Sequence, residues 1–445
     1  MFVDGERDTR HVVHVLDEKY TTMKPSVVSG VPAPELSTSG PPAAGGLAPI
    51  AQRIALLDVL RGISVLGILL LNIAAFSGTA FLDPKTAAGL PGASGDRTLH
   101  FLVVWLVEGK FYSLFSLLFG IGFAVMVTRA ERAGANPVPV LLRRYAALLV
   151  LGSVHAFLIW LGDILILYAL LGFVLLLFLR QPARVLVTWA VVLLAVPIVL
   201  YGVGLTVLPA DWGSAWWVPS RLVTAIGAFK SGSYGQVVAS NVDLAGMMWF
   251  RRLVLLFYPR VFGMFVLGFA LGRLRVFEAP GRHAALFRAL SWGGLLVGLP
   301  GSIVYALVER AEGFLPLTSG DYVRTVVDSI ATPLLSLGYV AWITWLFQHA
   351  RGQRALGWLA PVGRMALTNY LLHSIVLTWT FYGMGLGWFM RTSVATSTAI
   401  ALILYALQIV GSRLWLSRFG YGPVEWVWRW LTYGKRSQLL RRAAD

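Results

Sequence analysis

The sequence predicts an all-α protein, a polytopic transmembrane helix bundle of about ten helices with both termini in the cytoplasm. Of its 445 residues, 57% are hydrophobic and 13% are charged, whereas about 25% of a soluble globular chain is charged. Apolar segments also recur along the chain, each long enough or nearly long enough to cross a bilayer. They cover residues 54–76, 99–127, 144–161, 163–179, 184–208, 253–272, 288–308, 328–348, 362–382 and 394–412.

Two of these segments are irregular. The second is overlong and has the polar stretch "VEGKF" near its middle, so we expect it to break or tilt there. The third and fourth are short and are joined by a predicted tight turn at Gly162 and Asp163.

Three regions are expected around this bundle. Residues 1–50 are polar and rich in Pro, Ser, Gly and Ala, which is typical of a disordered extension. Residues 51–419 form the bundle, and residues 420–445 form a cytoplasmic, amphipathic interfacial helix with a basic tail. A long outer loop at 209–252 carries Trp212, Trp216 and Trp217, a predicted aromatic anchor at the membrane surface.

The distribution of the basic residues, which give a net charge of +16, agrees with this topology. Most Lys and Arg residues fall in the loops that this orientation places in the cytoplasm, where they face anionic membrane lipids. We therefore expect lipid contacts and no nucleic-acid partner. The chain has no cysteine, which excludes disulfides and thiolate metal sites, and no metal site of another kind is predicted.

Ionisable residues inside a membrane span are expensive and normally face a bundle interior or a wet cavity. In the first span, Asp58, Arg61 and Asn72 share one helical face. They are consistent with a polar stripe along a transmembrane cavity. A structural ion pair with one interhelical hydrogen bond explains them equally well.

Two further spans carry candidates of the same kind. Lys110 lies near mid-depth in the second span and needs a carboxylate, a carbonyl or an anionic ligand. In the ninth span, Arg364 lies at the cytoplasmic start, and Asn369 and His373 are one turn apart on one face. A binding role and a packing role remain open for each.

"VHAFLIWLGD" contains His155 and Asp163 on either side of the predicted turn. A neutral imidazole can act as a general base when a carboxylate holds its tautomer. Asp is also a preferred N-cap residue, so Asp163 is first expected to cap the next helix. The spacing alone does not decide whether the two side chains touch.

Several stretches together resemble the YeiB-like family of bacterial membrane proteins. They are "LDVLRGISVLGILLLNI", "GKFYSLFSLLFGIGF", "VHAFLIWLGDILILYALLG", "GRMALTNYLLHSIV", "FYGMGLG" and "GPVEWVWRWLTY". The resemblance covers residues 53–435 and implies a multi-pass protein of the bacterial inner (plasma) membrane.

That family is similar to the larger transmembrane acyltransferase superfamily, which includes heparan-alpha-glucosaminide N-acetyltransferase. The similarity lies mainly in the first helix, where Asp58, Arg61, Gly62 and Asn72 match. It implies acyl transfer from cytoplasmic acyl-CoA, such as acetyl-CoA, to a hydroxyl or amine acceptor at the outer side. The superfamily's histidine in or just after this helix has no counterpart between Arg53 and Leu99.

We therefore expect His155 to replace it as the base or acyl holder, with His373 as the second candidate. Asp163 would orient His155, and Asn72 would hydrogen-bond the carbonyl oxygen. Asp58, Arg61 and Lys110 would handle the charged donor. The alternatives are a transporter or a lipid- or quinone-binding membrane protein without catalysis, and a homodimer packed through glycine-rich helices.

Overall fold

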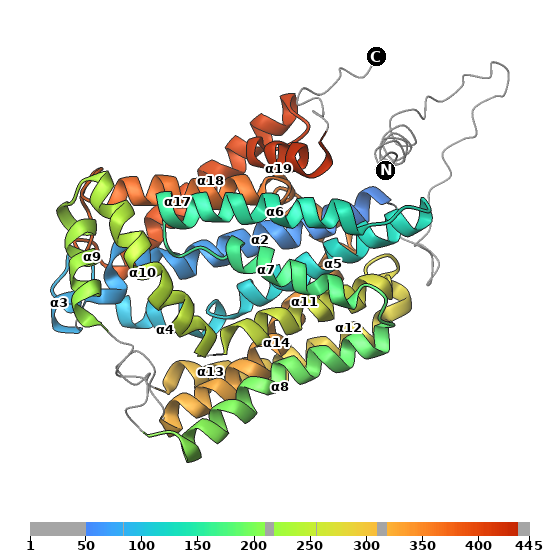
Figure 1. Ribbon diagram of the computed structural model, residues 1–445, viewed down its shortest axis with the longest axis horizontal. Coiled ribbons are helices and arrows are strands. Elements are labelled where there is room, and N and C mark those ends of the chain that lie inside the picture. Colours follow the sequence, from blue (N-terminus) through green and yellow to red (C-terminus); the bar gives the residue numbers. More distant parts are fainter. Residues whose placement is uncertain (1–49, 83, 210–217, 255, 309–317, 435–445) are drawn as a thin grey trace, which may run out of the picture.

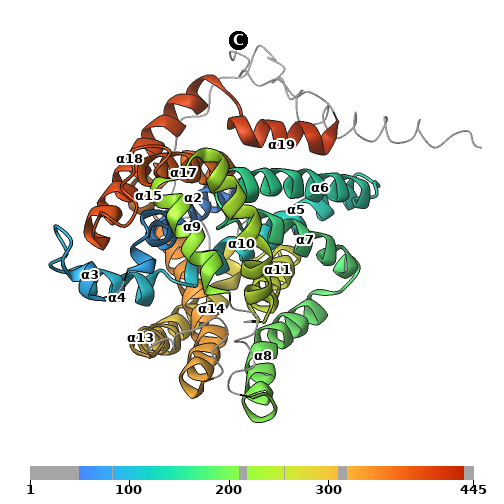
Figure 2. The same ribbon diagram turned by 60° about the vertical axis from the view of Figure 1, so that its left-hand side comes forward.

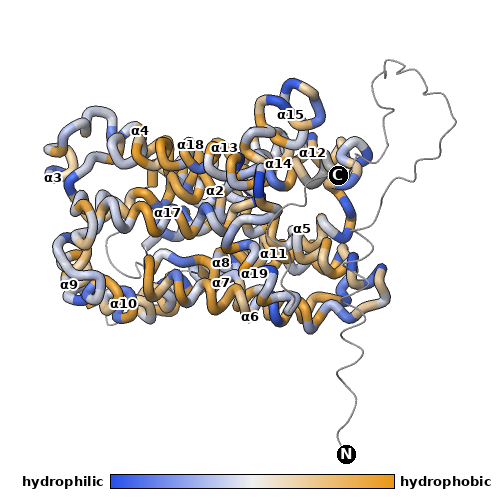
Figure 3. Tube along the Cα trace, turned by 90° about the horizontal axis from the view of Figure 1, so that it is seen from above, coloured by the Kyte–Doolittle hydropathy of each residue, from blue (hydrophilic) through white to orange (hydrophobic). Residues whose placement is uncertain are grey.

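The computed structural model describes residues 50–82, 84–209, 218–254, 256–308 and 318–434. Within these ranges the chain is built from helices and has no β-strand. The longest helices run side by side (Figure 1), and their apolar residues lie along the length of the bundle, with hydrophilic residues gathered toward its ends (Figure 3). Seven of the described helices are long and apolar enough to cross a membrane. The all-α, polytopic fold class is therefore confirmed.

The helices follow one another closely along the chain. The first half contains α2 (Ile50–Ser77), η1 (Thr79–Phe81), α3 (Pro84–Ala88), α4 (Asp96–Leu106), α5 (Lys110–Arg132), α6 (Val138–Val154), η2 (His155–Ile159), α7 (Leu165–Leu175), η3 (Leu176–Phe178), α8 (Ala183–Val207) and α9 (Pro219–Ser231). The second half contains α10 (Tyr234–Val254), α11 (Phe257–Arg273), η5 (Pro280–His283), α12 (Ala284–Gly293), η6 (Gly294–Gly298), α13 (Leu299–Leu307), α14 (Ser319–Phe347), α15 (Ala350–Gly357), α16 (Ala360–Arg364), α17 (Ala366–Phe381), α18 (Val394–Arg418) and α19 (Pro423–Tyr433).

The expected count of about ten spans is not confirmed. The described part of the chain has seven spans, or eight if the bent pair α10 and α11 counts as one. The fourth apolar segment forms only the short stretch Leu165–Phe178. The ninth is divided at Met365 into α16 and the 16-residue α17. Hydropathy counts apolar residues along the sequence, but it does not register where a helix is interrupted.

The second apolar segment breaks where its polar residues predicted. α4 ends at Leu106, Gly109 adopts a φ of 84°, and α5 begins at Lys110. Glycine reaches this left-handed conformation without steric cost. A Cβ at Gly109 would also lie 2.8 Å from the Thr332 methyl group, so both the backbone conformation and the packing require glycine here.

The expected outer loop at 209–252 is largely helical, which corrects the sequence prediction. Residues 219–254 form α9 and α10, which lie together at one end of the bundle (Figure 1). Their polar side chains lowered the hydropathy of this stretch without preventing helix formation. The tryptophans proposed as an anchor, Trp212, Trp216 and Trp217, lie outside the described residues.

Two glycine-rich helices pack directly against each other inside the chain. A Cβ at Gly120 of α5 would lie 2.0 Å from the Phe265 carbonyl oxygen of α11. A Cβ at Gly268 of α11 would lie 2.1 Å from the Leu117 carbonyl oxygen of α5. The backbones therefore approach as closely as small residues allow in membrane helices. The glycines suggested for a homodimer serve this contact within one chain.

The C-terminal helix α19 lies outside the main bundle (Figure 2) and is held to it by polar contacts. Glu425 Oε1 accepts hydrogen bonds from the backbone N–H groups of Leu367 (2.7 Å) and Thr368 (3.0 Å) at the start of α17. The Trp428 indole donates to the Arg144 carbonyl oxygen at 3.0 Å. Burial raises the pKa of the Glu425 carboxyl, and the hydrogen bonds from Thr368 and Leu367 offset part of that rise.

Glu425→Ala is expected to loosen α19 from the bundle. The substitution leaves two helix N-terminal donors without their carboxylate, at a cost of about 1–3 kcal/mol. Hydrogen–deuterium exchange should therefore accelerate in α19 and in the first turn of α17. Glu131→Ala is the control, because Glu131 is half exposed and forms only a surface ion pair with Arg273. Equal exchange in both variants would contradict this role of Glu425.

Candidate functional site

The site forms where α6 ends irregularly. The helix widens into the π-helical turn η2, and Trp160 then turns extended while its N–H donates to the His155 carbonyl oxygen at 2.8 Å. The Trp160 ring covers Gly162, where a Cβ would lie only 2.1 Å from it. π-helical turns are frequent at functional sites. In this protein, the π-helical turn directs the His155 side chain into the bundle. The chain then folds back, so that Asp163 lies beside His155.

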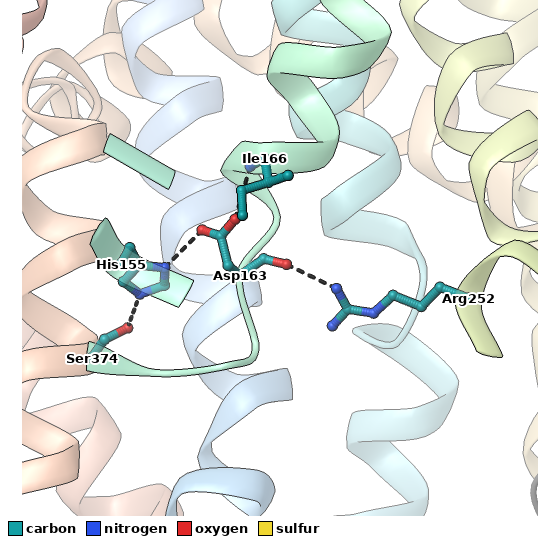
Figure 4. Close-up of polar contacts among 5 residues, drawn as sticks. All are labelled: His155, Asp163, Ile166, Arg252 and Ser374. Carbon is teal, nitrogen blue, oxygen red and sulfur yellow. Dashed lines mark hydrogen bonds and ion pairs between the residues drawn. The ribbon is translucent and has the colours of Figure 1, made fainter. Parts of the chain in front are cut away.

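His155 is held from both sides by hydrogen bonds (Figure 4). Its Nδ1 lies 2.7 Å from Asp163 Oδ2, and its Nε2 lies 2.8 Å from Ser374 Oγ on α17. The other Asp163 oxygen, Oδ1, accepts from the Ile166 backbone N–H at 2.8 Å. All three side chains are buried, with relative exposures of 0% for His155, 2% for Asp163 and 1% for Ser374. Asp163 thus fixes the start of α7 and contacts His155 at once.

These contacts constrain how the imidazole can be protonated. A carboxylate only accepts hydrogen bonds, so Nδ1 carries a proton and donates it to Asp163. In the neutral imidazole, the lone pair of Nε2 faces Ser374, whose hydroxyl can donate to it. A serine, a histidine and an aspartate in this order form the arrangement that activates a hydroxyl nucleophile on many unrelated folds.

Side chains of α10 donate hydrogen bonds to the backbone carbonyl groups around the site. Arg252 Nη1 donates to the Asp163 carbonyl oxygen at 2.8 Å. The irregular turn leaves the Phe157 and Leu158 carbonyls to accept from side chains, namely Asn241 Nδ2 (3.3 Å) and Tyr234 Oη (2.9 Å). Irregular backbone at membrane depth is tolerated where the protein supplies such partners.

A cavity of about 460 Å³, named the inner cavity after the predicted orientation, is lined in part by Tyr370, whose ring neighbours His155. Its size falls within the usual range of small-molecule sites. The charged residues that line it are Asp58, Arg61, Arg144, Arg364, Glu425 and Arg429. Its remaining wall is mainly apolar and aromatic and includes Tyr168 and Tyr370. The Tyr370 ring lies 5.1 Å from the His155 ring, and its buried hydroxyl has no hydrogen-bond partner among the described residues.

A second, smaller cavity has a volume of about 270 Å³ and is named the outer cavity after the predicted orientation. It is lined by Trp160, Arg251, Arg252, Asn241 and Tyr382, among others. It includes Ala75 near the C-terminal end of α2, whereas the inner cavity includes Asp58 near the N-terminal end. The two cavities therefore lie toward opposite ends of that helix. His155 is part of neither lining, but its ring neighbours Tyr370 of the inner cavity and Trp160 of the outer cavity.

The structure brings together three of the charged residues singled out in the sequence. Asp58 and Arg61 form an ion pair at 2.7 Å, and both line the inner cavity with Arg364. The expected pairing of Asp58 with Arg61 is therefore present. Arg364 donates to the Gly420 carbonyl oxygen at 3.3 Å.

The other candidates lie elsewhere. Asn369 donates to Ser412, and His373 bonds Gln408, so both tie α17 to α18. Lys110 is fully buried at the α4–α5 break and donates to the Val104 carbonyl oxygen. Asn72 is partly buried, lines neither cavity described here, and has no hydrogen bond within the described residues.

Ser374 and Tyr370 are the residues that sequence reasoning missed. Ser374 directly follows His373 and precedes an apolar stretch, where a serine usually bonds a carbonyl of its own helix. Its partner His155 is 219 residues away, so no local spacing pointed to it. The only local signal is the four-residue spacing of Tyr370 and Ser374, which places them on one face of α17.

These features define an α-helical, multi-pass membrane protein with a buried Ser–His–Asp cluster whose aromatic neighbours line two cavities. The chain belongs to the YeiB-like family of bacterial membrane proteins. Residues 271–435 match the family model described as "Protein of unknown function (DUF418)".

The relatives align over most of their length. The chain is 35% identical to "Uncharacterized protein YxaH" of Bacillus subtilis (strain 168) over 406 residues, which cover 86% of this chain and 94% of the relative. It is 28% identical to "Uncharacterized protein YeiB" of Escherichia coli (strain K12) over 402 residues, covering 86% and 96% of the two chains.

Proposed function

We propose that this protein transfers an acyl group across the bacterial inner membrane. The donor is acyl-CoA bound from the cytoplasm, and the acceptor is a hydroxyl or amine at the outer side. One observation carries the proposal: the His155 imidazole is hydrogen-bonded between Asp163 and Ser374, and its ring neighbours Tyr370 and Trp160 line two cavities toward opposite ends of α2.

The inner cavity suits the donor chemically. Guanidinium groups bind phosphate oxygens with charge-assisted hydrogen bonds, and four arginines line this cavity: Arg61, Arg144, Arg364 and Arg429. The Arg429 Nε atom is buried without a partner in the described structure. The apolar wall beyond these arginines matches the uncharged pantetheine arm and acyl chain. The charged nucleotide phosphates would stay at the basic end.

His155 supplies the proton chemistry in this proposal. Its Nε2 accepts a proton when a hydroxyl or amine attacks the acyl carbonyl, and Asp163 stabilises the imidazolium that results. Arg252 and Ile166 hold Asp163 in place, so the imidazole keeps its orientation between steps. The outer cavity would admit the acceptor.

Incubation of the purified protein with radiolabelled acetyl-CoA tests the proposal. Wild type is expected to release CoA or retain label, and His155→Ala is expected to lose both. His349→Ala is the control, because His349 is exposed and bonds only within its own region. The proposal fails if wild type shows no CoA release, no label and no thermal shift with CoA.

Arg364→Gln and Arg429→Gln are each expected to raise the half-saturating CoA concentration about tenfold. That change corresponds to about 1.4 kcal/mol, near the lower end of the range for a hydrogen bond to a charged group. Thermal-shift titration with CoA measures this concentration. Added salt should also weaken CoA binding to wild type, because it screens the charges. Arg391→Gln, an exposed residue outside both cavities, is the control. Unchanged affinity in the two cavity variants would remove CoA from this cavity.

A second candidate function is transport without catalysis. Cavities toward opposite ends of α2, lined by ring neighbours of an ionisable His155, also suit alternating exposure of a proton-coupled substrate. Acetyl-CoA that remains intact with wild-type protein, combined with His155-dependent proton movement in liposomes, would favour this function over acyl transfer.

A further inference from the structure

Helix α17 presents the Ser374 hydroxyl and the Tyr370 ring to His155. Ser374 and Tyr370 are four residues apart, so they lie one turn apart on the same helical face. Ser374 Oγ reaches His155 Nε2 at 2.8 Å, and the Tyr370 ring contacts the same imidazole. Tyr370 also lines the inner cavity, so it is the side chain of α17 that connects that cavity with the buried cluster.

The Ser374 hydroxyl is bonded differently from its neighbours. Thr378 and Thr380 on the same helix, and Ser64 on α2, each donate to a carbonyl four residues earlier. This is the ordinary way for a transmembrane helix to satisfy a hydroxyl. Ser374 Oγ instead lies 2.8 Å from His155 Nε2, the imidazole nitrogen that Asp163 does not contact. The hydroxyl is therefore placed for activation, whereas the others only satisfy their own helices.

We propose that Ser374 is the nucleophile and carries the acyl group as a covalent ester. The inference rests on the acyl transfer proposed above. His155 Nε2 takes the Ser374 hydroxyl proton while Oγ attacks the thioester carbonyl of acyl-CoA. The carbon–sulfur bond then breaks, and the CoA thiolate leaves with the proton from His155. In the second half, the acceptor hydroxyl or amine gives its proton to His155, attacks the ester, and Ser374 Oγ leaves and regains a proton.

A covalent carrier explains why two separate cavities are present. CoA and the acceptor never need to occupy the site together, because the acyl group waits on Ser374 between the two half-reactions. Tyr370 lies toward the inner cavity and Trp160 toward the outer one. Rotation of one aromatic side chain at a time would expose Ser374 to one cavity while the other stays closed.

Tyr370 has a defined part in the first half-reaction. A donor entering the inner cavity displaces the Tyr370 ring from His155 and accepts a hydrogen bond from its hydroxyl. Removal of one hydrogen-bond donor to a developing oxyanion typically lowers the rate about 10²–10³-fold. Tyr370 is thus the hydrogen-bond donor to the acyl carbonyl oxygen, a role that the sequence analysis gave to Asn72. Asn72 lines neither cavity.

Covalent labelling of the full-length protein tests the inference. After incubation with radiolabelled acetyl-CoA and denaturation, wild type should retain label that maps to the Ser374 peptide. An ester should survive hydroxylamine at neutral pH and be released at alkaline pH, whereas an acyl-imidazole is lost at neutral pH. Ser374→Ala should abolish the label. Ser374→Cys should form a thioester, which neutral hydroxylamine releases.

Control variants separate catalysis from folding. Ser64→Ala removes a buried hydroxyl of a transmembrane helix without touching the cluster and should label like wild type. Tyr370→Phe should slow labelling about 10²-fold and leave the CoA-induced thermal shift unchanged. Thermal unfolding of Ser374→Ala, with and without CoA, shows whether the variant folds. If Ser374→Ala does not fold, Ser374→Cys provides the test. A label on Ser374→Cys that resists neutral hydroxylamine, as the wild-type label does, overturns the assignment of Ser374 as the nucleophile.

The outcomes also distinguish this inference from the proposed function. CoA release by wild type that continues at the same rate in Ser374→Ala overturns Ser374 as the carrier and leaves acyl transfer intact. Label that maps to His155 in place of Ser374 has the same consequence. A wild-type protein that neither releases CoA nor binds it overturns the acyl transfer itself.

Discussion

Asp163→Asn should lower the rate of acyl transfer by about 10³–10⁴-fold without unfolding the protein. Asn retains an oxygen that can accept from the Ile166 N–H, and Asn and Asp are equally good at helix N-termini. Its amide nitrogen, however, presents hydrogens to His155 Nδ1. The imidazole must then carry its proton on Nε2, where it can no longer accept the proton of Ser374. The matching substitution in the serine protease triad has an effect of about this size.

Two measurements separate the roles of this carboxylate. Asp163→Asn should keep the thermal stability of wild type, whereas Asp163→Ala should also lose about 1 kcal/mol because the Ile166 N–H in the first turn of α7 loses its acceptor. In ¹⁵N NMR of the labelled histidine, the proton should move from Nδ1 to Nε2 in Asp163→Asn. An unchanged tautomer, or full activity in this variant, would show that Asp163 acts only as a cap.

Gly120→Ala and Gly268→Ala should each destabilise the bundle by about 1–3 kcal/mol, the usual cost of overpacking. Each new Cβ would lie about 2 Å from a backbone carbonyl oxygen of the facing helix. Backbone atoms cannot rotate away as a flexible side chain can, so α5 and α11 must separate. That shift also disturbs Phe265 of α11 in its stack with Phe119, which lines the inner cavity.

The sign of the effect makes this prediction specific. In an unhindered helix, Gly→Ala normally stabilises a protein by about 0.4–1 kcal/mol because it restricts the unfolded chain. Gly411→Ala on α18 is the control, since its Cβ would meet no atom within 4 Å. Thermal unfolding in detergent should therefore show Gly411→Ala at or above wild type and the two interface variants below it. Equal stability of all three variants would contradict the close α5–α11 contact.

Much of the fold follows from local properties of the sequence. Apolar segments placed most of the spans, and the polar "VEGKF" stretch located the break at Gly109. The count of spans and the helices α9 and α10 were not obtained in this way. Hydropathy averages over a window, so it neither detects a short interruption such as Met365 nor identifies a polar helix.

The site was predictable only in part, for the same reason. Asp163 was expected to start a helix and to be a candidate partner of His155, and its two oxygens make both contacts. The pairing of Asp58 with Arg61 needs only three residues of helix and was also foreseen. Ser374 was not, because nothing near it in the chain marks it as the partner of His155.

By itself, the sequence determined an all-α membrane bundle, the break at Gly109 and the pairing of residues within a turn or two of each other. These depend on helix geometry and on the cost of polar groups in lipid, which act over a few residues. Only the tertiary structure decided that His155 meets Ser374 across 219 residues, and that its neighbours Tyr370 and Trp160 line two cavities. Such contacts depend on how the helices pack, and close packing is a property of the whole bundle.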